Sequence, residues 1–420
     1  MPDERETAID ILMEIEKEHG YSGIVLSRSL NREAGLDQRG RGLVTEIVNG
    51  CMRNLIWIDY IIDNFSKIPA SKMEPFIRHL LRAAVYQIKF MDRIPISAAV
   101  NEAVKLARKR SFTGLSGFVN AVLRSIARSP TPLPDKAQGL DKYLSVRYSF
   151  PLWIVRYYIN HYGAEKAERI CEAGVQPSHV HICVNTIRIS RDELLGHIDA
   201  ESSGVNGADL SKPSDISKLK PFRDGLFHVM DESSMKAVEI LDPKPGEIIM
   251  DLCAAPGGKS FYSAYLMENQ GHIYAWDIHP HKVKLINDSA RRLGVRNVTT
   301  SVSDASVFNA AFEEKADRVL IDAPCTGLGV AGRKPDLKYS RTESDIKPLA
   351  QAQRDILNAG WRYVKPNGVL VYSTCTLTRE ENEDNTAWFL SNYPFKLEYE
   401  ELLLPGKSDG FYIARFLRKE

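Results

Sequence analysis

Residues 321–329 read IDAPCTGLG and continue the run RVLI at positions 318–321. An apolar run that ends at an acid, a proline, a cysteine and two glycines is typical of a buried strand leading into a functional loop. Asp322 and Cys325 lie three positions apart on this turn, where a small planar substrate could meet both side chains. Read alone, the stretch predicts that Cys325 is a nucleophile and that Asp322 is its acid partner.

From about residue 230 onward, the chain alternates strands with helices. We expect strands at 248–252, 272–277, 297–302, 317–321 and 369–372, with helices at 261–267, 282–293 and 348–364. This order predicts an α/β domain with an open, doubly wound parallel sheet, in which ligands bind beyond the carboxyl ends of the strands. The motifs at those ends are Asp251, Asp277, Asp304, Asp322 and Ser373-Thr374-Cys375. The strands that precede Cys325 and Cys375 are expected to be neighbours.

Composition limits the class of protein. A chain of 420 residues suggests two or three domains, and its net charge of +1 gives no evidence about partners. The six cysteines are scattered without a Cys-x-x-Cys pair, so we expect no metal site, no disulfide framework and a reducing cytoplasm. No stretch approaches the roughly 18 apolar residues of a membrane span, and the polar start does not resemble a signal peptide.

Residues 1–130 are predicted to form an all-helical domain. Apolar residues recur at helical spacing in 8–15, in 77–88 and in 100–107, which indicates a helical bundle. Pro75 suits a first helical turn, and Ser97 is a candidate N-cap for the third of these helices.

Between Glu102 and Asp135 the sequence has basic residues and no acidic one. The basic residues are Lys105, Arg108, Lys109, Arg110, Arg124 and Arg128. Small residues between 111 and 117 predict a helix, a loop and a second helix, an arrangement that can bind phosphate groups. In a nearly neutral protein this one-sign patch favours nucleic acid binding, and the alternative is a solvated helix face.

Three alternating prolines in residues 129–134 predict a linker that cannot continue a helix. A small α+β connecting subdomain is expected at 140–225, with the catalytic domain at 226–420. Within the subdomain we expect a helix at 143–162, a strand at 181–189, a helix at 191–198 and a loop at 204–213.

The turn after the first strand of the catalytic domain predicts a nucleoside cofactor without a pyrophosphate. It lacks the Gly-x-Gly-x-x-Gly pattern of dinucleotide sites and is not a phosphate-binding P-loop. Gly257 and Gly258 let the backbone approach a ligand, Asp277 can accept hydrogen bonds from ribose hydroxyls, and Asp304 can accept one from an adenine amino group. S-adenosylmethionine fits this pattern, and the alternative is that the acids only cap strand ends.

Cys375 follows a buried strand, as Cys325 does, and residues 378–381 read TREE, a capping-box pattern for the next helix. Carbon 5 of a pyrimidine is a poor nucleophile, and a thiolate added to carbon 6 makes it reactive. Such chemistry needs a nucleophilic cysteine, an acid near N3 and a base. The sequence offers Cys375, Asp322 and Cys325 for these roles, although a buried cysteine is often only a small apolar residue.

Several motifs resemble known families. The segments LRAAVYQ at 81–87, DRIP at 92–95, AVNEAV at 99–104 and GFVNAVLR at 117–124 resemble the NusB-type RNA-binding domain. DLCAAPGGK at 251–259, DAPCTG at 322–327 and STC at 373–375 resemble the RNA cytosine-5 methyltransferases of the NOL1/NOP2/Sun superfamily. The combination covers nearly the whole chain and resembles the bacterial RsmB/Sun family, which implies a Rossmann-like class I S-adenosylmethionine-dependent fold and action on cytosine 967 of 16S ribosomal RNA.

The resemblance also implies roles for individual residues. Cys375 attacks carbon 6, Cys325 assists release instead of attacking, and Asp322 lies near N3 of the base. The implied cofactor-binding residues are Cys253, Ala254, Ala255, Pro256, Gly257, Gly258, Lys259, Ser260, Asp277, Asp304 and Asp322. The expected RNA-binding residues are Lys105, Arg108, Lys109, Arg110, Arg124, Arg333 and Lys334, with unassembled or early small-subunit 16S ribosomal RNA as the partner.

Two other functions compete with this interpretation. A DNA cytosine methyltransferase would attack from the Pro-Cys motif and would lack the second cysteine, so Cys375 and the NusB-like segment disfavour it. A non-catalytic RNA-binding or assembly factor is disfavoured by the presence of Cys325, Cys375 and Asp322 together.

Overall fold

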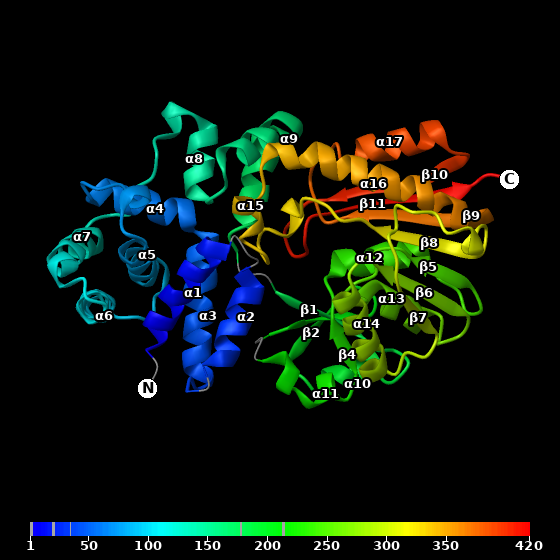
Figure 1. The fold of residues 1–420 in the computed structure, drawn as a ribbon, viewed down its shortest axis with the longest axis horizontal. Helices are drawn as coiled ribbons and strands as arrows, with labels where there is room; N and C mark the ends of the chain where they lie inside the picture. The colour runs from blue at the N-terminus through cyan, green and yellow to red at the C-terminus, as the bar shows by residue number, and fades with distance from the viewer. Residues whose placement is uncertain (1–2, 19–21, 34, 177–178, 212–214) are drawn as a thin grey trace. The chain divides into compact units, whose positions relative to one another are not determined.

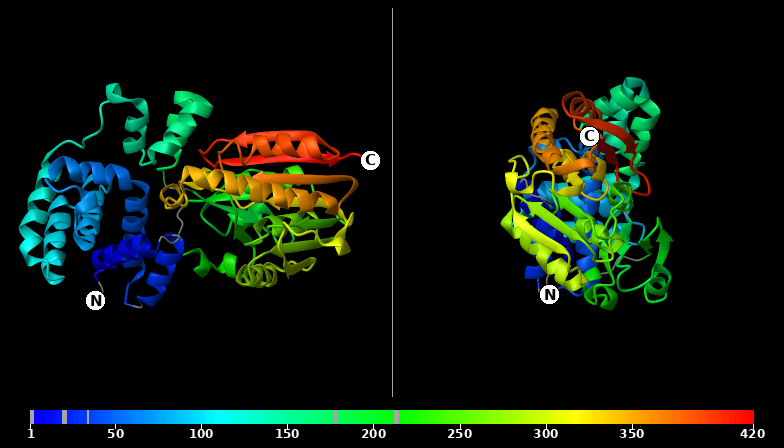
Figure 2. Two further views of the ribbon diagram at one scale, coloured as in Figure 1. Left: turned by 45° about the horizontal axis from the view of Figure 1, so that its top comes forward. Right: turned by 90° about the vertical axis from the view of Figure 1, so that its right-hand side faces the viewer.

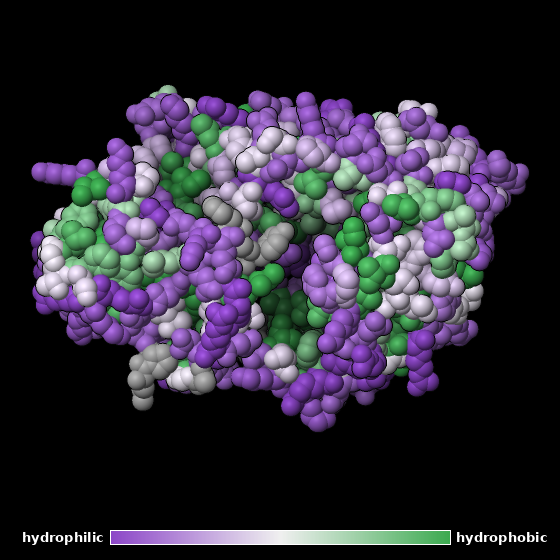
Figure 3. Space-filling model, viewed as in Figure 1, coloured by the Kyte–Doolittle hydropathy of each residue, from purple (hydrophilic) through white to green (hydrophobic). Residues whose placement is uncertain are grey.

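The computed structural model describes residues 3–18, 22–33, 35–176, 179–211 and 215–420 (Figure 1). The chain separates into two units, Met1–Pro177 with Ala331–Glu343, and Ser178–Val330 with Ser344–Glu420. The chain thus leaves the second unit shortly after Cys325 and returns to it at Ser344. Hydrophilic side chains cover most of the face shown in Figure 3. Among the described residues, no helix has the length and apolar character needed to cross a membrane.

The described part of the first unit contains helices and no strand, as the apolar spacing predicts. Its helices are α1 (Glu4–Glu18), α2 (Ser22–Arg32), α3 (Gln38–Arg53), α4 (Leu55–Phe65), α5 (Pro75–Phe90), α6 (Ile96–Lys109), α7 (Ser116–Arg128), α8 (Leu140–Arg147), α9 (Leu152–Ala173) and α15 (Leu337–Ser340). The predicted stripes of α1 and α5 are buried in one core. Pro75 begins α5 as predicted. The expected N-cap at Ser97 is wrong, because α6 begins at Ile96, after Pro95, so that Ser97 lies inside the helix.

Residues 129–134 have no helix or strand, in agreement with the predicted linker. The helix expected over 143–162 is two helices, because the chain turns at 148–151 before Pro151 caps the start of α9. From the distant segment that completes the first unit, Lys338 is fully buried and donates to the carbonyl oxygens of Arg53 (3.0 Å) and Tyr148 (3.5 Å). Burial lowers the pKa of Lys338 to about 7.

A small antiparallel sheet opens the second unit. Its strands are β1 (Val180–Val184), β2 (Ala200–Ser203), β3 (Gly207–Leu210) and β4 (Phe227–Val229), in the order β2-β3-β1-β4, with α10 (Arg191–Leu195) and α11 (Lys220–Arg223) beside them. The strand and the helix expected here end earlier than predicted, at Val184 and Leu195. The expected loop at 204–213 is partly wrong, because β3 pairs with both β1 and β2; positions 212–213 lie outside the described residues.

The larger sheet has the predicted parallel centre and an antiparallel edge that the sequence analysis missed. Its order is β10-β11-β9-β8-β5-β6-β7, formed by β5 (Ile248–Asp251), β6 (His272–Asp277), β7 (Val298–Val302), β8 (Ala316–Asp322), β9 (Val364–Thr374), β10 (Phe395–Leu403) and β11 (Phe411–Arg418). The strands β5 to β9 are parallel. Because β8 pairs with β9 in the register Asp322 to Ser373, the strands before the two cysteines are neighbours, as predicted.

Helices cover both faces of this sheet (Figures 1 and 2). One face carries α12 (Glu232–Leu241), α13 (Gly258–Leu266) and α14 (Pro280–Leu293), and the other carries α16 (Ile346–Gly360) and α17 (Glu383–Asn392). The core therefore has two layers, with Leu320 and Val371 on the first face and Ile321 and Tyr372 on the second. This alternation along β8 and β9 fixes which strand residues end near the ligand-binding edge.

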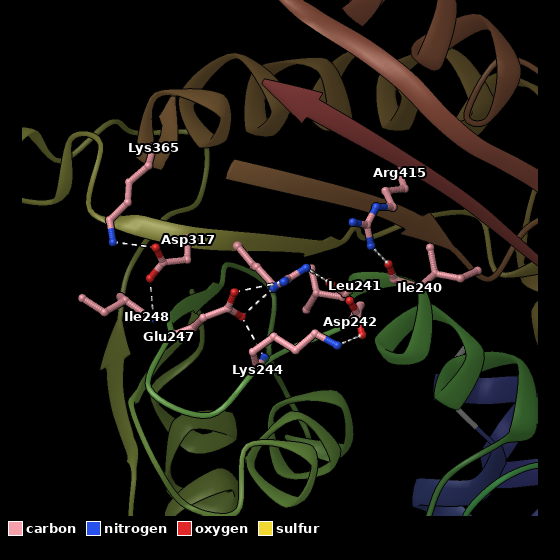
Figure 4. Close-up of polar contacts among 10 residues, drawn as sticks. Ile240, Leu241, Asp242, Lys244, Glu247, Ile248, Asp317, Lys365 and Arg415 are labelled. Carbon is pink, nitrogen blue, oxygen red and sulfur yellow. Dashed lines mark hydrogen bonds and ion pairs between the residues drawn. The ribbon is translucent and has the colours of Figure 1, made fainter. Parts of the chain in front are cut away.

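The amino ends of the parallel strands are held by a charged cluster (Figure 4). Arg318 donates to Glu247 through Nε (2.5 Å) and Nη2 (2.9 Å), and to the carbonyl of Leu241 through Nη1 (2.6 Å). Arg415 donates to the carbonyl of Ile240. The two arginines thus bind carbonyl groups of the last turn of α12, where positive charge is favourable.

Candidate active site

The turn between β5 and α13 requires a glycine. Gly257 has φ of +106°, and a Cβ at this position would lie 2.5 Å from the ring of Phe261. The backbone amide of Phe261 donates to the carbonyl of Gly257 at 2.9 Å, so the ring packs directly against the turn. A side chain at 257 would therefore displace the start of α13, whose first residue is Gly258.

A hollow of about 260 Å³ lies at the carboxyl ends of β5, β6, β7 and β8. Five of the predicted cofactor residues line it: Cys253, Ala255, Asp277, Asp304 and Asp322. The other predicted cofactor residues are absent from its lining: Ala254, Pro256, Gly257, Gly258, Lys259 and Ser260. Residues that the sequence analysis missed complete the wall: Leu252, Ile278, His279, Lys282, Ser303, Ala305, Pro324 and Ile356. Most of these residues lie within two positions of an acid at a strand end. Their closeness to these acids in the sequence could have identified them.

The hollow combines carboxylates with apolar walls. Asp277 is 6% exposed, accepts the backbone N–H of His279 at 2.9 Å and lies 3.8 Å from Nζ of Lys282. Asp304 is exposed, and hydrogen bonds from the hydroxyl and backbone amide of Ser306 lower its pKa. Carboxylate oxygens suit ribose hydroxyls and amino groups, and the apolar walls suit a purine ring. The residues present therefore fit an S-adenosylmethionine site.

Asp251 and Lys259 support the hollow from the turn. Asp251 is buried and accepts the hydroxyl of Ser260 at 2.6 Å, while its other oxygen has no hydrogen-bond partner in the described part of the chain. Burial raises the pKa of Asp251 to about 7. Lys259 donates to Oδ2 of Asp322 at 2.7 Å, and Ser373 donates to Oδ1 of Asp322 at 2.9 Å. These contacts fix the Asp322 carboxylate between two strand ends.

Cys325 and Cys375 meet beside Asp322. Their Sγ atoms are 3.3 Å apart, and both residues are partly buried. The backbone amide of Gly329 donates to the carbonyl of Cys375 at 3.0 Å, which ties the two loops together directly. The hydrogen bond with Cys375, followed by burial, raises the pKa of the Cys325 thiol.

The capping box expected at residues 378–381 is wrong. Helix α17 begins at Glu383, after Asn382, and residues 379–382 form turns. The Thr378 hydroxyl donates to the Glu381 carboxylate, a contact between side chains that differs from the side-chain-to-backbone bonds of a capping box. Both side chains instead face the turn of Cys325, because Glu381 also accepts the backbone N–H of Thr326 at 2.9 Å.

The predicted RNA-binding residues lie in three different settings. Acidic residues of α1 reach the end of α6: Lys109 and Arg110 pair with Glu6, and Arg110 also pairs with Asp10. Lys105 pairs with Glu102 on its own helix at 2.7 Å. The one-sign patch expected from the sequence is therefore partly neutralised.

Arg108 and Arg124 are exposed, and the Arg124 Nε donates to Asn120 at 2.9 Å. Arg333 and Lys334 are also exposed. Lys338, on α15 four positions after Lys334, is buried and donates to backbone carbonyl oxygens, so it cannot reach a phosphate.

Comparisons with known proteins agree with this geometry. Residues 238–417 match the family model "16S rRNA methyltransferase RsmB/F", residues 2–128 match the NusB family, and residues 150–212 match the ferredoxin-like domain of RsmF/B-like methyltransferases. A probable ribosomal RNA small subunit methyltransferase B of Bacillus subtilis (strain 168) is 39% identical over 398 residues, which cover 93% of this chain and 88% of the relative. The chain belongs to the RsmB family.

Another RsmB relative, from Proteus mirabilis (strain HI4320), is 31% identical and covers 92% of each chain. Solved structures agree with the fold. A methyltransferase homologue from Pyrococcus horikoshii is 34% identical with a TM-score of 0.58, covering 66% of this chain and 97% of that one. NSun6 from the same organism, solved with SFG, is 26% identical with a TM-score of 0.59, covering 65% and 99%. Like its family, the chain is an S-adenosylmethionine-dependent ribosomal RNA methyltransferase.

We expect Asp251→Asn to flatten the pH dependence of thermal stability. The folded pKa of Asp251, about 7, exceeds the ordinary value of 3.8, so the folded state retains a proton that the unfolded chain releases. This group therefore makes the protein less stable as pH rises from about 4 to about 7. Melting curves of the cofactor-free protein between pH 5 and 7.5 should show that the melting temperature of the variant rises relative to that of the wild type as pH rises. A constant difference in melting temperature would contradict the raised pKa.

Proposed function

We propose that this protein transfers a methyl group to carbon 5 of a cytosine in 16S ribosomal RNA through a covalent adduct with Cys375. The observation that carries the proposal is the pair of sulfur atoms 3.3 Å apart, beside the hollow and Asp322. Membership of the RsmB family supports ribosomal RNA of the small subunit as the substrate, and we propose cytosine 967 from the resemblance of the motifs. We place the reaction in the cytoplasm.

Each side chain has a role that its contacts suit. The cofactor supplies the methyl group. The Cys375 thiolate adds to carbon 6, and the electron pair of the carbon 5–carbon 6 double bond moves toward N3. Asp322, held by Lys259 and Ser373, is the acid that we place near N3: it gives a proton to N3 as the adduct forms and takes it back when carbon 5 accepts the methyl group. The enamine so formed gives carbon 5 the electron density that methyl transfer requires.

Release reverses the first addition. The proton on carbon 5 leaves to water, its electron pair restores the double bond to carbon 6, and the bond from carbon 6 to the Cys375 sulfur breaks. Cys325 assists this departure from 3.3 Å, where its thiol can donate a hydrogen bond to the leaving sulfur. A raised pKa suits this role, because it keeps the proton on Cys325.

The three segments have different tasks in this proposal. Residues 1–130 bind the RNA, residues 140–225 connect, and residues 226–420 bind the cofactor and perform the reaction. A target base within a helix must be turned out of the stack at a cost of roughly a few kcal/mol, so an unpaired loop is the favoured target.

Alanine substitutions of the two cysteines should have opposite effects on the adduct. Cys375→Ala should abolish methyl transfer and give no adduct, because no thiolate adds to carbon 6. Cys325→Ala should accumulate a protein–RNA adduct that migrates slowly on a denaturing gel, because release loses its hydrogen-bond donor. Adduct in Cys375→Ala and none in Cys325→Ala would show that the two roles are reversed.

The exposed arginine side chains of the first unit should contribute to RNA affinity through contacts with phosphate groups. The double change Arg108→Glu and Arg124→Glu should weaken RNA binding about tenfold and reduce the salt slope by about 2, since each phosphate contact contributes about 0.9 to that slope. Cofactor binding should be unchanged. The double change Lys142→Glu and Lys166→Glu, at exposed positions on α8 and α9 of the same unit, is the matched charge control. Fluorescence anisotropy across salt concentrations tests this, and equal losses in both proteins would contradict the assignment.

A further inference from the structure

A buried carboxylate without a cationic partner in the described parts of the chain lies behind the cysteine pair. Glu381 is completely buried. Its Oε1 accepts the backbone N–H of Thr326 (2.9 Å) and Nε2 of Gln353 (2.9 Å). Its Oε2 accepts the hydroxyls of Thr326 (2.7 Å) and Thr378. Four neutral donors therefore occupy the four lone-pair sites of an ionised carboxylate, which has acceptors only.

These contacts connect the loops of both cysteines. Thr326 directly follows Cys325, and its hydroxyl also lies 2.5 Å from that of Thr376, which directly follows Cys375. Gln353 on α16 extends the network by donating to the carbonyl of Pro324 at 2.9 Å, on the other side of Cys325. Glu381 and its partner Gln353 thus bind the residues before and after Cys325, so the turn has little freedom to move away from Cys375.

The network is itself fixed by the second core layer. Tyr372, on the strand that leads to Cys375, donates to the carbonyl of Glu381 at 2.6 Å and is fully buried. Asn385 on α17 donates to Oε1 of Gln353 at 2.8 Å. A charge buried among neutral partners is costly to maintain, and its hydrogen bonds must all be made. Apolar side chains at these positions would stabilise the fold equally well. The buried polar network therefore points to a role in the reaction.

We propose that Glu381 is a positioning residue that holds the Cys325 turn against Cys375 and keeps Cys325 as the hydrogen-bond donor of the pair. This inference rests on the proposed function for the roles of the two cysteines. Negative charge behind Cys325 opposes formation of a second thiolate there, so the single thiolate of the pair is Cys375. The charge of Glu381 adds to the effects of Cys375 and of burial that raise the pKa of Cys325. One buried anion would then set which sulfur attacks and which assists release.

The test measures thiol reactivity in the full-length protein without RNA, so that it does not depend on the proposed methyl transfer. Wild-type protein and Glu381→Gln are treated with iodoacetamide from pH 6 to pH 10, and peptide mass spectrometry follows Cys325 and Cys375 separately. Glutamine preserves the shape and can accept from Thr326 and Gln353, but it removes the charge. We expect the midpoint for Cys325 alkylation to fall by about one pH unit, which makes its alkylation about tenfold faster near neutral pH.

Two further variants separate charge from positioning and from stability. Thr326→Val keeps the charge but loses the hydroxyl contact, so the Cys325 midpoint should stay while release of the RNA adduct slows. Glu247→Gln removes a carboxylate at the opposite edge of the sheet (Figure 4) and should change neither cysteine. An unchanged Cys325 midpoint in Glu381→Gln, or equal shifts in Glu381→Gln and Glu247→Gln, would overturn the inference.

If Glu381→Gln does not fold, Thr326→Val decides the matter, because normal release in that variant would overturn the positioning role. Failure of the proposed function has a different signature. A shifted Cys325 midpoint with no adduct in any variant would uphold the effect of Glu381 on the thiol and would refute the covalent mechanism.

Discussion

The parallel pairing of β8 with β9 is the constraint on which the site depends. The register that places Asp322 opposite Ser373 brings two loops, separated by fifty positions in the sequence, to the same end of the sheet. Backbone hydrogen bonds continue this pairing beyond the strands, from Ala323 to Ser373 and from Gly329 to Cys375. A shift of one residue would turn the strand side chains to the opposite face and move Cys325 away from Cys375.

Three acidic side chains near the carboxyl ends of the parallel strands have three different environments. Asp322 has a cationic partner, Lys259, and a hydroxyl donor. Asp251 is buried with no direct cationic partner among the described residues, and burial raises its pKa to about 7. Glu381 accepts four neutral hydrogen bonds and acts on the turn of Cys325. Environment, more than residue type, thus assigns each carboxyl group its task.

The features that were predicted correctly from the sequence are those that a local pattern of residues determines. Strand patterns that end at acids identified β5 to β8, an apolar run before Ser373 identified β9, and the family motifs indicated both cysteines. The sequence could not predict β10 and β11, because the pairing partner of an edge strand is set by the tertiary fold. The Thr378–Glu381 pair has the spacing of a capping box, and only the position of Thr326 shows that the carboxylate is used elsewhere. Likewise, the pairing of Glu6 with Lys109 joins residues about a hundred positions apart, so a local count of charge misses it.

The central claim is that Cys375, and not Cys325, bonds to carbon 6 of the cytosine. The most direct measurement treats the wild-type protein with S-adenosylmethionine and a 16S ribosomal RNA fragment that carries 5-fluorocytidine at the target. Fluorine at carbon 5 cannot leave as a cation, so release stops and the adduct persists. After digestion, mass spectrometry should find the nucleotide on the peptide that contains Cys375. A nucleotide on the Cys325 peptide, or on neither cysteine, would contradict the account.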